Sequence, residues 1–176
     1  MNDEKKIDAL VKRAVDAGLE GLDFLASFSY AELAAGYNGI GPEFLSAGLR
    51  GAVTDWLWIF EPPALVHDMR NEVADGTRAA FLYANDEFRR NCLKMAEKTY
   101  PRMFRDFRAR YRAKAVAQIL YDFVSADSFG WKAWMEATAR HREKLEKLVG
   151  VGETLHPPTP TQISNQPPPT QTQTSN

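Results

Sequence analysis

The stretch PPALVHDMRNEVADGTR, residues 62–78, decides the fold. Two adjacent prolines suit the first turn of a helix, and the apolar residues that follow predict that this helix runs to about Val73. An Asp-Gly pair then ends the helix, and Thr77 is a good N-cap for a second helix over roughly 78–98. Because the connection is so short, we expect the two helices to pack as an antiparallel pair.

Helical periodicity extends over most of the N-terminal part of the chain. Apolar residues recur at spacings of three and four over 3–26, a stretch that two glycines break into two pieces. Ser29 is a plausible cap for a short helix that follows. The glycine-rich segment 36–42 predicts a loop. Residues 43–60 fit either a buried helix or a short strand.

The C-terminal half predicts two further helices. Pro101 opens one that runs to about Ala126, and Ser128 caps the last one. The apolar stripe of the first is formed by Phe104, Phe107, Tyr111, Ile119 and Phe123, and the last carries Trp131, Trp134, Met135, Leu145 and Leu148. Together these patterns predict a mainly α protein with a single helical domain over residues 1–150.

Residues 151–176 differ from that domain in composition. Their six prolines alternate with Thr, Gln, Ser and Asn, and Glu153 is their only charged residue. A segment with so little apolar surface cannot offset its ordering entropy, so we expect a disordered Pro/Thr/Gln-rich tail. Both an inert tail and a proline-rich ligand for a partner are compatible with this composition.

Composition and charge exclude several classes of protein. The 176 residues carry a net charge of −1, which gives no bulk attraction to nucleic acid, and we expect no nucleic-acid partner. The N-terminus lacks the apolar region of a signal peptide, and no run approaches the roughly 18 apolar residues of a spanning helix. Cys92 is the only cysteine, so it forms no internal disulfide, and its place on an apolar stripe predicts a small buried hydrophobe. These features predict a cytoplasmic protein.

The dipeptide His67-Asp68 is the strongest chemical signal. His67 is the only one of three histidines inside an apolar-patterned segment. On an antiparallel helix pair, Asp86 would face it and hold one imidazole nitrogen, and the other nitrogen would deprotonate a water molecule. Asp68 points about 100° away on the helix and suits a hard cation such as calcium. The carbonyls of the Gly39-Ile40-Gly41 loop are good further donors.

The same residues also have structural explanations. A His-Asp pair on a helix is often a capped or ion-paired structure, and Asp86 can pair with Arg89 or Arg90 one helical turn away. The aromatic run Trp56–Phe60 fits either a membrane interface or a buried core. The basic residues over 102–114 fit either phosphate binding or a solvated helix face.

Three motifs together resemble the phospholipase A2-like superfamily. They are the Tyr-x-Gly-x-Gly loop at 37–41, the helical His67-Asp68 box and the downstream Asn85-Asp86-x-x-Phe88 helix. The chain is most similar to the small, disulfide-free His-Asp proteins of bacteria and phages. Those proteins share an element like Thr54-Asp55 and a Phe-Gly-x-x-Ala-Trp-like ending, matched here by residues 129–134. The resemblance covers roughly residues 37–135.

This resemblance implies a calcium-dependent phospholipase A2-like ester hydrolase that acts on a phospholipid substrate or at a membrane surface. His67 would be the general base and Asp86 its orienting acid, and Asp68 would bind calcium with the carbonyls near Ile40 and Gly41. The family usually carries a tyrosine four residues after the histidine, where this chain has Asn71. The alternative is a non-catalytic, phage-derived structural or assembly protein that retains the fold and is associated with a virion.

Overall fold

The computed structural model describes residues 3–38 and 57–153, and the side chains to residue 147. Regular structure in these ranges is helical throughout, which confirms the mainly α prediction. The helices are α1 Asp3–Ala17, α2 Leu22–Leu25, α3 Tyr30–Gly36, a 3-10 turn Trp58–Phe60, α5 Glu61–Glu72, α6 Arg78–Thr99, α7 Phe107–Ser125, a π-helical turn Asp127–Trp131 and α8 Lys132–Glu153. Helix α8 therefore extends three residues into the segment predicted to be a tail. The rest of that tail, and most of the segment 43–60, lie outside the described residues.

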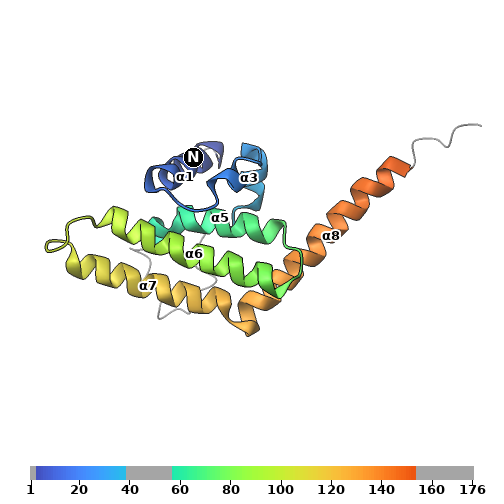
Figure 1. The fold of residues 1–176 in the computed structure, drawn as a ribbon. Coiled ribbons are helices and arrows are strands. Elements are labelled where there is room, and N and C mark those ends of the chain that lie inside the picture. Colours follow the sequence, from blue (N-terminus) through green and yellow to red (C-terminus); the bar gives the residue numbers. More distant parts are fainter. Residues whose placement is uncertain (1–2, 39–56, 154–176) are drawn as a thin grey trace, which may run out of the picture.

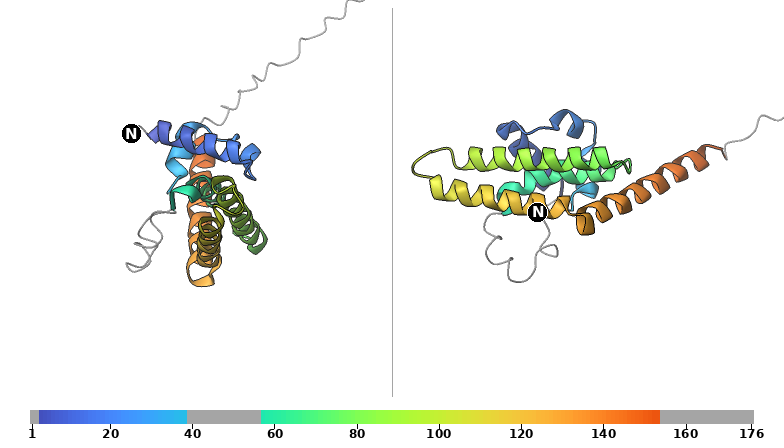
Figure 2. Two further views of the ribbon diagram at one scale, coloured as in Figure 1. Left: turned by 90° about the vertical axis from the view of Figure 1, so that its left-hand side faces the viewer. Right: turned by 60° about the horizontal axis from the view of Figure 1, so that its bottom comes forward.

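The helices lie in layers around α6. Helices α6 and α7 form an antiparallel hairpin, α5 packs against α6, and α1 and α3 lie over α5 (Figure 1). Two further views show the same arrangement, with α8 leaving the body at the end of the hairpin opposite the α6–α7 connection (Figure 2). No helix in the described part has the length and apolar character needed to cross a membrane.

The residues predicted to begin α3, α5 and α6 do so in the structure. Ser29 caps α3 with a reciprocal capping box to Glu32, and the Oγ1 of Thr77 accepts a hydrogen bond from the backbone N–H of Ala80 at 3.2 Å. Two prolines occupy the first turn of α5. Residues 73–77 turn the chain back, so the antiparallel pair of α5 and α6 forms as expected. Cys92 is fully buried, as predicted.

Helix α7 differs from its prediction in both its start and its buried face. It begins at Phe107, and Pro101 lies in the α6–α7 connection. Most of the predicted apolar stripe faces solvent: Phe104 is 94% exposed, Phe107 63%, Tyr111 69% and Ile119 45%. The buried face is instead Ala113, Ala117 and Leu120, packed with Cys92 and Ala96 of α6. Small side chains on both helices permit close packing, so the alanine face and not the aromatic face is buried.

The start of α8 also differs from the prediction. Ser128 does not cap a helix, because it lies inside the π-helical turn that joins α7 to α8. A Cβ at Gly130 would overlap the backbone carbonyl of Val124, so this turn requires glycine. Of the apolar residues predicted for α8, Trp134 is buried against Phe81, whereas Met135 and Leu145 are largely exposed. The side chain of Leu148 lies outside the described part.

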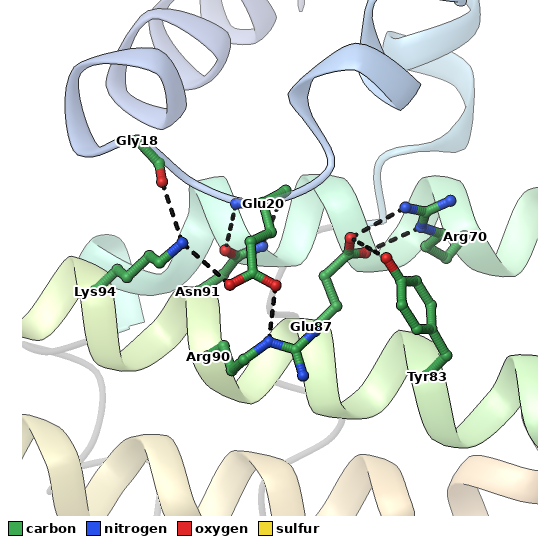
Figure 3. Close-up of polar contacts among 8 residues, drawn as sticks. All are labelled: Gly18, Glu20, Arg70, Tyr83, Glu87, Arg90, Asn91 and Lys94. Carbon is green, nitrogen blue, oxygen red and sulfur yellow. Dashed lines mark hydrogen bonds and ion pairs between the residues drawn. The ribbon is translucent and has the colours of Figure 1, made fainter.

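A cluster of polar side chains binds residues 18–21, the link between α1 and α2, to α6 (Figure 3). Asn91 is fully buried, accepts from the backbone N–H of Glu20 at 2.7 Å and donates to its carbonyl oxygen at 3.0 Å. The carboxylate of Glu20 bridges Arg90 at 2.7 Å and Lys94 at 3.1 Å. These contacts hold the link against α6.

A buried ion pair joins α5 to α6 beside this cluster. Arg70 donates from Nε and Nη2 to the two carboxylate oxygens of Glu87, at 2.9 and 3.0 Å (Figure 3). The Glu87 side chain is 1% exposed. The guanidinium group lies over the ring of Phe24 in α2, 3.9 Å from its centroid. One pair thus connects three helices.

Gly21 should be the least replaceable glycine of the α1–α2 link. Its φ is +83°, and a Cβ there would lie 2.8 Å from Cγ1 of Val66 and 3.0 Å from Oε1 of Glu87. Gly18 has φ +61° but open space around it. We expect Gly18→Ala to lower the free energy of unfolding by about 1–2 kcal/mol and Gly21→Ala by about 2–5 kcal/mol, because only the second adds a clash to the strain. Denaturant titration measures both values, and equal losses would show that the contact with Val66 and Glu87 is unimportant.

Removal of Arg70 should destabilise the protein strongly. Arg70→Met leaves the Glu87 carboxylate buried without its cation, at an expected cost of about 3–5 kcal/mol. Arg90→Met is the matched control, because its ion pair with Glu20 is solvent-exposed and we expect a loss of about 1 kcal/mol or less. Thermal and urea unfolding of both variants tests the difference. Similar losses would mean that the buried pair matters no more to the fold than the exposed one.

Candidate functional site

A pocket of about 290 Å³ lies between α5, α6, α7 and the π-helical turn. Its wall is mostly apolar and includes Phe81, Phe88, Phe123 and Phe129. The polar side chains that line it are His67, Asp68, Asn71 and Asn85. A mainly apolar cavity with a few polar groups is typical of a small-molecule site. The structure therefore brings His67 and Asp68 of the predicted site to one pocket.

His67 is held between two side-chain amides. Its Nε2 lies 2.9 Å from Oδ1 of Asn85, and its Nδ1 lies 3.4 Å from Nδ2 of Asn71. A carbonyl oxygen only accepts hydrogen bonds, so Nε2 carries the ring proton and Nδ1 keeps its lone pair. The ring also packs against Phe88, with centroids 5.0 Å apart. These contacts fix the tautomer and the orientation of the ring.

The surroundings of His67 favour its neutral form. Burial lowers the pKa of His67 below the ordinary value of 6.5, and the hydrogen bond to Asn85 and the charge of Glu87 offset this only in part. The imidazole is therefore neutral at neutral pH. Neutral imidazole is the form that accepts a proton from water or from a substrate.

Asn85 presents an unsatisfied donor in the same place. The residue is 1% exposed and its Oδ1 is used by His67, but no hydrogen-bond partner for its Nδ2 occurs in the described part of the chain. A buried donor without a partner costs about 1–3 kcal/mol. A ligand in the pocket with an acceptor oxygen near Asn85 would satisfy it.

The expected contact between Asp86 and His67 is wrong. Oδ1 of Asp86 accepts from the hydroxyl of Tyr121 in α7 at 3.0 Å, and the residue is exposed. Successive residues of a helix point about 100° apart, so when Asn85 faces α5 its neighbour must point elsewhere. The residue that orients His67 is Asn85, one position earlier. Asp86 does not line the pocket.

Asp68 lies where the glycine-rich loop begins. Its Oδ2 accepts a hydrogen bond at 2.9 Å from the backbone N–H of Asn38, two residues before Ile40. Ile40 and Gly41, the other predicted calcium ligands, lie outside the described residues. Within the ranges that are described, no cluster of three or more His, Cys, Asp or Glu side chains is arranged to hold a metal ion. Asp68 is thus the one predicted calcium ligand whose position is known.

Sequence reasoning missed Asn85 and the aromatic wall of the pocket. Phe81, Asn85 and Phe88 follow an i, i+4, i+7 spacing, which places them on one face of α6. That spacing was the available signal, because a polar residue between two buried phenylalanines requires a partner. Phe123 of α7 stacks on Phe129 of the π-helical turn, with ring centroids 4.9 Å apart, and no local periodicity predicts that contact.

Comparisons with known proteins add no relative. No protein-family model matches this chain, and neither a curated protein nor a solved structure matches it. The assignment of a function therefore rests on the sequence motifs and on the geometry of the pocket.

The burial of His67 should appear in the pH dependence of stability. Because its folded-state pKa lies below its unfolded-state value, the unfolded chain takes up a proton first as the pH falls below about 6.5. Wild type should therefore lose more stability between pH 7.5 and pH 5 than His67→Gln, whose side chain does not titrate. Urea unfolding across this range, with a calcium chelator present, gives the two slopes. Parallel slopes would mean that His67 is not held neutral by burial.

Proposed function

We propose that the pocket binds an acyl ester and that His67 acts there as the general base of a phospholipase A2-like hydrolase. One observation carries the proposal: a neutral imidazole, oriented through Nε2 by Asn85, lines a mostly apolar pocket. The aromatic wall suits an acyl chain, and the free donor on Asn85 suits an ester oxygen. The sequence resemblance supports the same chemistry.

The residues of the pocket define a sequence of proton movements. Nδ1 of His67 takes a proton from a water molecule, and the hydroxide adds to the ester carbonyl to give a tetrahedral intermediate. The imidazolium then returns the proton to the leaving alcohol oxygen as the carbon–oxygen bond breaks. This water replaces the side-chain amide of Asn71, whose Nδ2 lies 3.4 Å from Nδ1, as the partner of Nδ1.

The imidazolium formed in this step has a neutral neighbour. Oδ1 of Asn85 stabilises it as a dipole, and the negative charge that favours it is that of Glu87. An aspartate at position 85 would supply a full charge to the same nitrogen. The amide thus keeps the base oriented but makes it weaker than a histidine paired with a carboxylate.

Calcium is the cofactor that the resemblance implies, and bound calcium would polarise the ester carbonyl. Asp68, together with the carbonyls of Ile40 and Gly41, would hold it. The hydrogen bond between Asn38 and Asp68 supports this part of the proposal, because the backbone N–H of Asn38, two residues before Ile40, lies against the carboxylate. Calcium prefers such oxygen ligands.

A binding protein without turnover is the second candidate. The observation that favours it is the amide at position 85. An amide gives the imidazolium of a catalytic step no counter-charge, whereas the binding of a ligand does not require that charge. In this form the pocket would hold a fatty acid or a similar amphiphile, with its polar group at Asn85. A phage-derived structural or assembly protein that retains the fold belongs to this class.

Fatty acid release from mixed phospholipid micelles, with calcium or with a chelator, separates the two candidates. We expect calcium-dependent release by wild type and a loss of about 10²–10⁴-fold in His67→Gln. Asn85→Asp should raise kcat, because a carboxylate stabilises the imidazolium more than an amide does, and should also raise KM, because the Nδ2 donor for the ester oxygen is lost. Asp86→Asn should leave the rate unchanged, since Asp86 contacts Tyr121 and not the pocket.

Equal release by wild type and His67→Gln would contradict the hydrolase, because it would remove His67 from the reaction. A large loss in Asp86→Asn would contradict the orienting role of Asn85 and favour the dyad expected from the motifs. Ala133→Trp tests the binding alternative, because Ala133 is exposed at the pocket wall and a large side chain there fills the cavity. Binding of a fluorescent fatty acid that Ala133→Trp abolishes, without release by any variant, would show a binding protein.

A further inference from the structure

The α6–α7 connection and the first turns of α7 expose large apolar side chains. We call this surface the α7 tip. It consists of Met103, Phe104, Phe107 and Tyr111, which are 67%, 94%, 63% and 69% exposed. Phe107 and Tyr111 stack on each other, with centroids 6.4 Å apart. Several large apolar side chains exposed so close together in the sequence mark an interaction site more often than isolated exposed residues do.

Unpaired positive charge surrounds the tip. Between residues 101 and 114 the chain has six cations and one carboxylate. Arg110 and Lys114 bond to Tyr100 and Glu97. The other four cations are exposed, and their side chains form no hydrogen bond or ion pair with described residues: Arg102, Arg105, Arg108 and Arg112. The charge is local, because the whole chain has a net charge of −1.

The two kinds of side chain are arranged side by side. Phe107 and Tyr111 are four residues apart and share one face of α7, and Arg108 and Arg112 follow on the neighbouring face. Arg102 and Arg105 flank Met103 and Phe104 in the connection. This connection forms the far end of the α6–α7 hairpin and projects beyond the other helices (Figures 1 and 2).

We propose that the α7 tip docks the protein on an anionic lipid surface. Met103 and Phe104 would enter the boundary between headgroups and acyl chains, and the four arginines would lie against the lipid phosphates. A single-stranded nucleic acid fits less well, because it is normally held in a positively charged groove and the tip is a projection.

The tip is separate from the pocket. Asn85 and Tyr100, both at α6, are fifteen residues apart, which corresponds to about 22 Å along the helix. The proposal therefore goes beyond the proposed hydrolase, because docking at the tip requires neither His67 nor a bound acyl ester. If the tip does not dock, fatty acid release from micelles still tests the hydrolase. If no fatty acid is released, binding to vesicles still tests the docking.

Vesicle flotation of the full chain tests the proposal. We expect binding to vesicles of phosphatidylcholine with roughly one third phosphatidylglycerol, little binding to phosphatidylcholine alone, and release at high salt. Phe104→Ser should weaken binding about tenfold. Arg105→Gln with Arg108→Gln should weaken it about 25-fold, at about fivefold for each arginine. All three side chains are exposed, so melting temperatures should stay at the wild-type value.

Matched controls lie on α8, at the other end of the molecule. Leu145 is 49% exposed and Arg142 is also exposed, so Leu145→Ser and Arg142→Gln change the same properties away from the tip. Both should bind as wild type does. Equal binding to neutral vesicles, equal losses in the α8 variants, or no vesicle binding at all would each overturn the proposal. Tighter binding to a single-stranded oligonucleotide than to anionic vesicles would overturn it in favour of nucleic acid.

Discussion

The carboxylate of Glu87 is almost completely buried, and three helices are arranged around it. Arg70 of α5 supplies two hydrogen bonds, Phe24 of α2 covers the other side of the guanidinium, and Gly21 leaves the room that any Cβ would fill. Loss of one partner from a buried ion pair costs several kcal/mol, whereas the intact pair adds little to the free energy of unfolding because both charges lose their hydration. This arrangement therefore fixes the geometry of the helices rather than adding much stability. The position of α5 relative to α6, on which the pocket depends, follows from it.

Helix α6 has two buried polar faces with different consequences. Glu87 and Asn91 lie on the face that bonds to Arg70 and to the α1–α2 link, and there both carboxylate oxygens of Glu87 and both amide atoms of Asn91 have partners. Asn85 lies on the face toward the pocket, where Oδ1 bonds to His67 and Nδ2 has no partner among the described residues. A fully satisfied network specifies a structure, whereas an unsatisfied buried donor is a place where a ligand gains a hydrogen bond. The difference between the two faces supports the functional assignment of Asn85.

Local signals in the sequence predicted the helices but not the rotation of each helix about its axis. Caps and breaks such as Ser29 and Thr77 involve neighbours within four residues, so they are visible in the sequence. The contact of His67 depends on which residue of α6 faces α5, and an error of one position replaced Asn85 by Asp86. Buried contacts far apart in sequence, such as that between Arg70 and Glu87, set this rotation. The fold class and the position of His67 could therefore be predicted. The spacing of Phe81, Asn85 and Phe88 marks Asn85 as a buried polar residue, but it does not say that His67 is its partner.

The error in α7 has a different physical origin. Hydrophobicity alone assigns the aromatic face to the core, but the hairpin buries the face on which Ala113 and Ala117 meet Cys92 and Ala96, because small residues let the backbones approach closely. Close packing of the small face leaves the larger apolar surface in water at Phe104 and Phe107. Exposed apolar side chains of this kind, bordered by arginines without partners in the described part, are typical of an interaction surface. The same choice of face that closes the hairpin thus leaves the α7 tip available for an anionic surface.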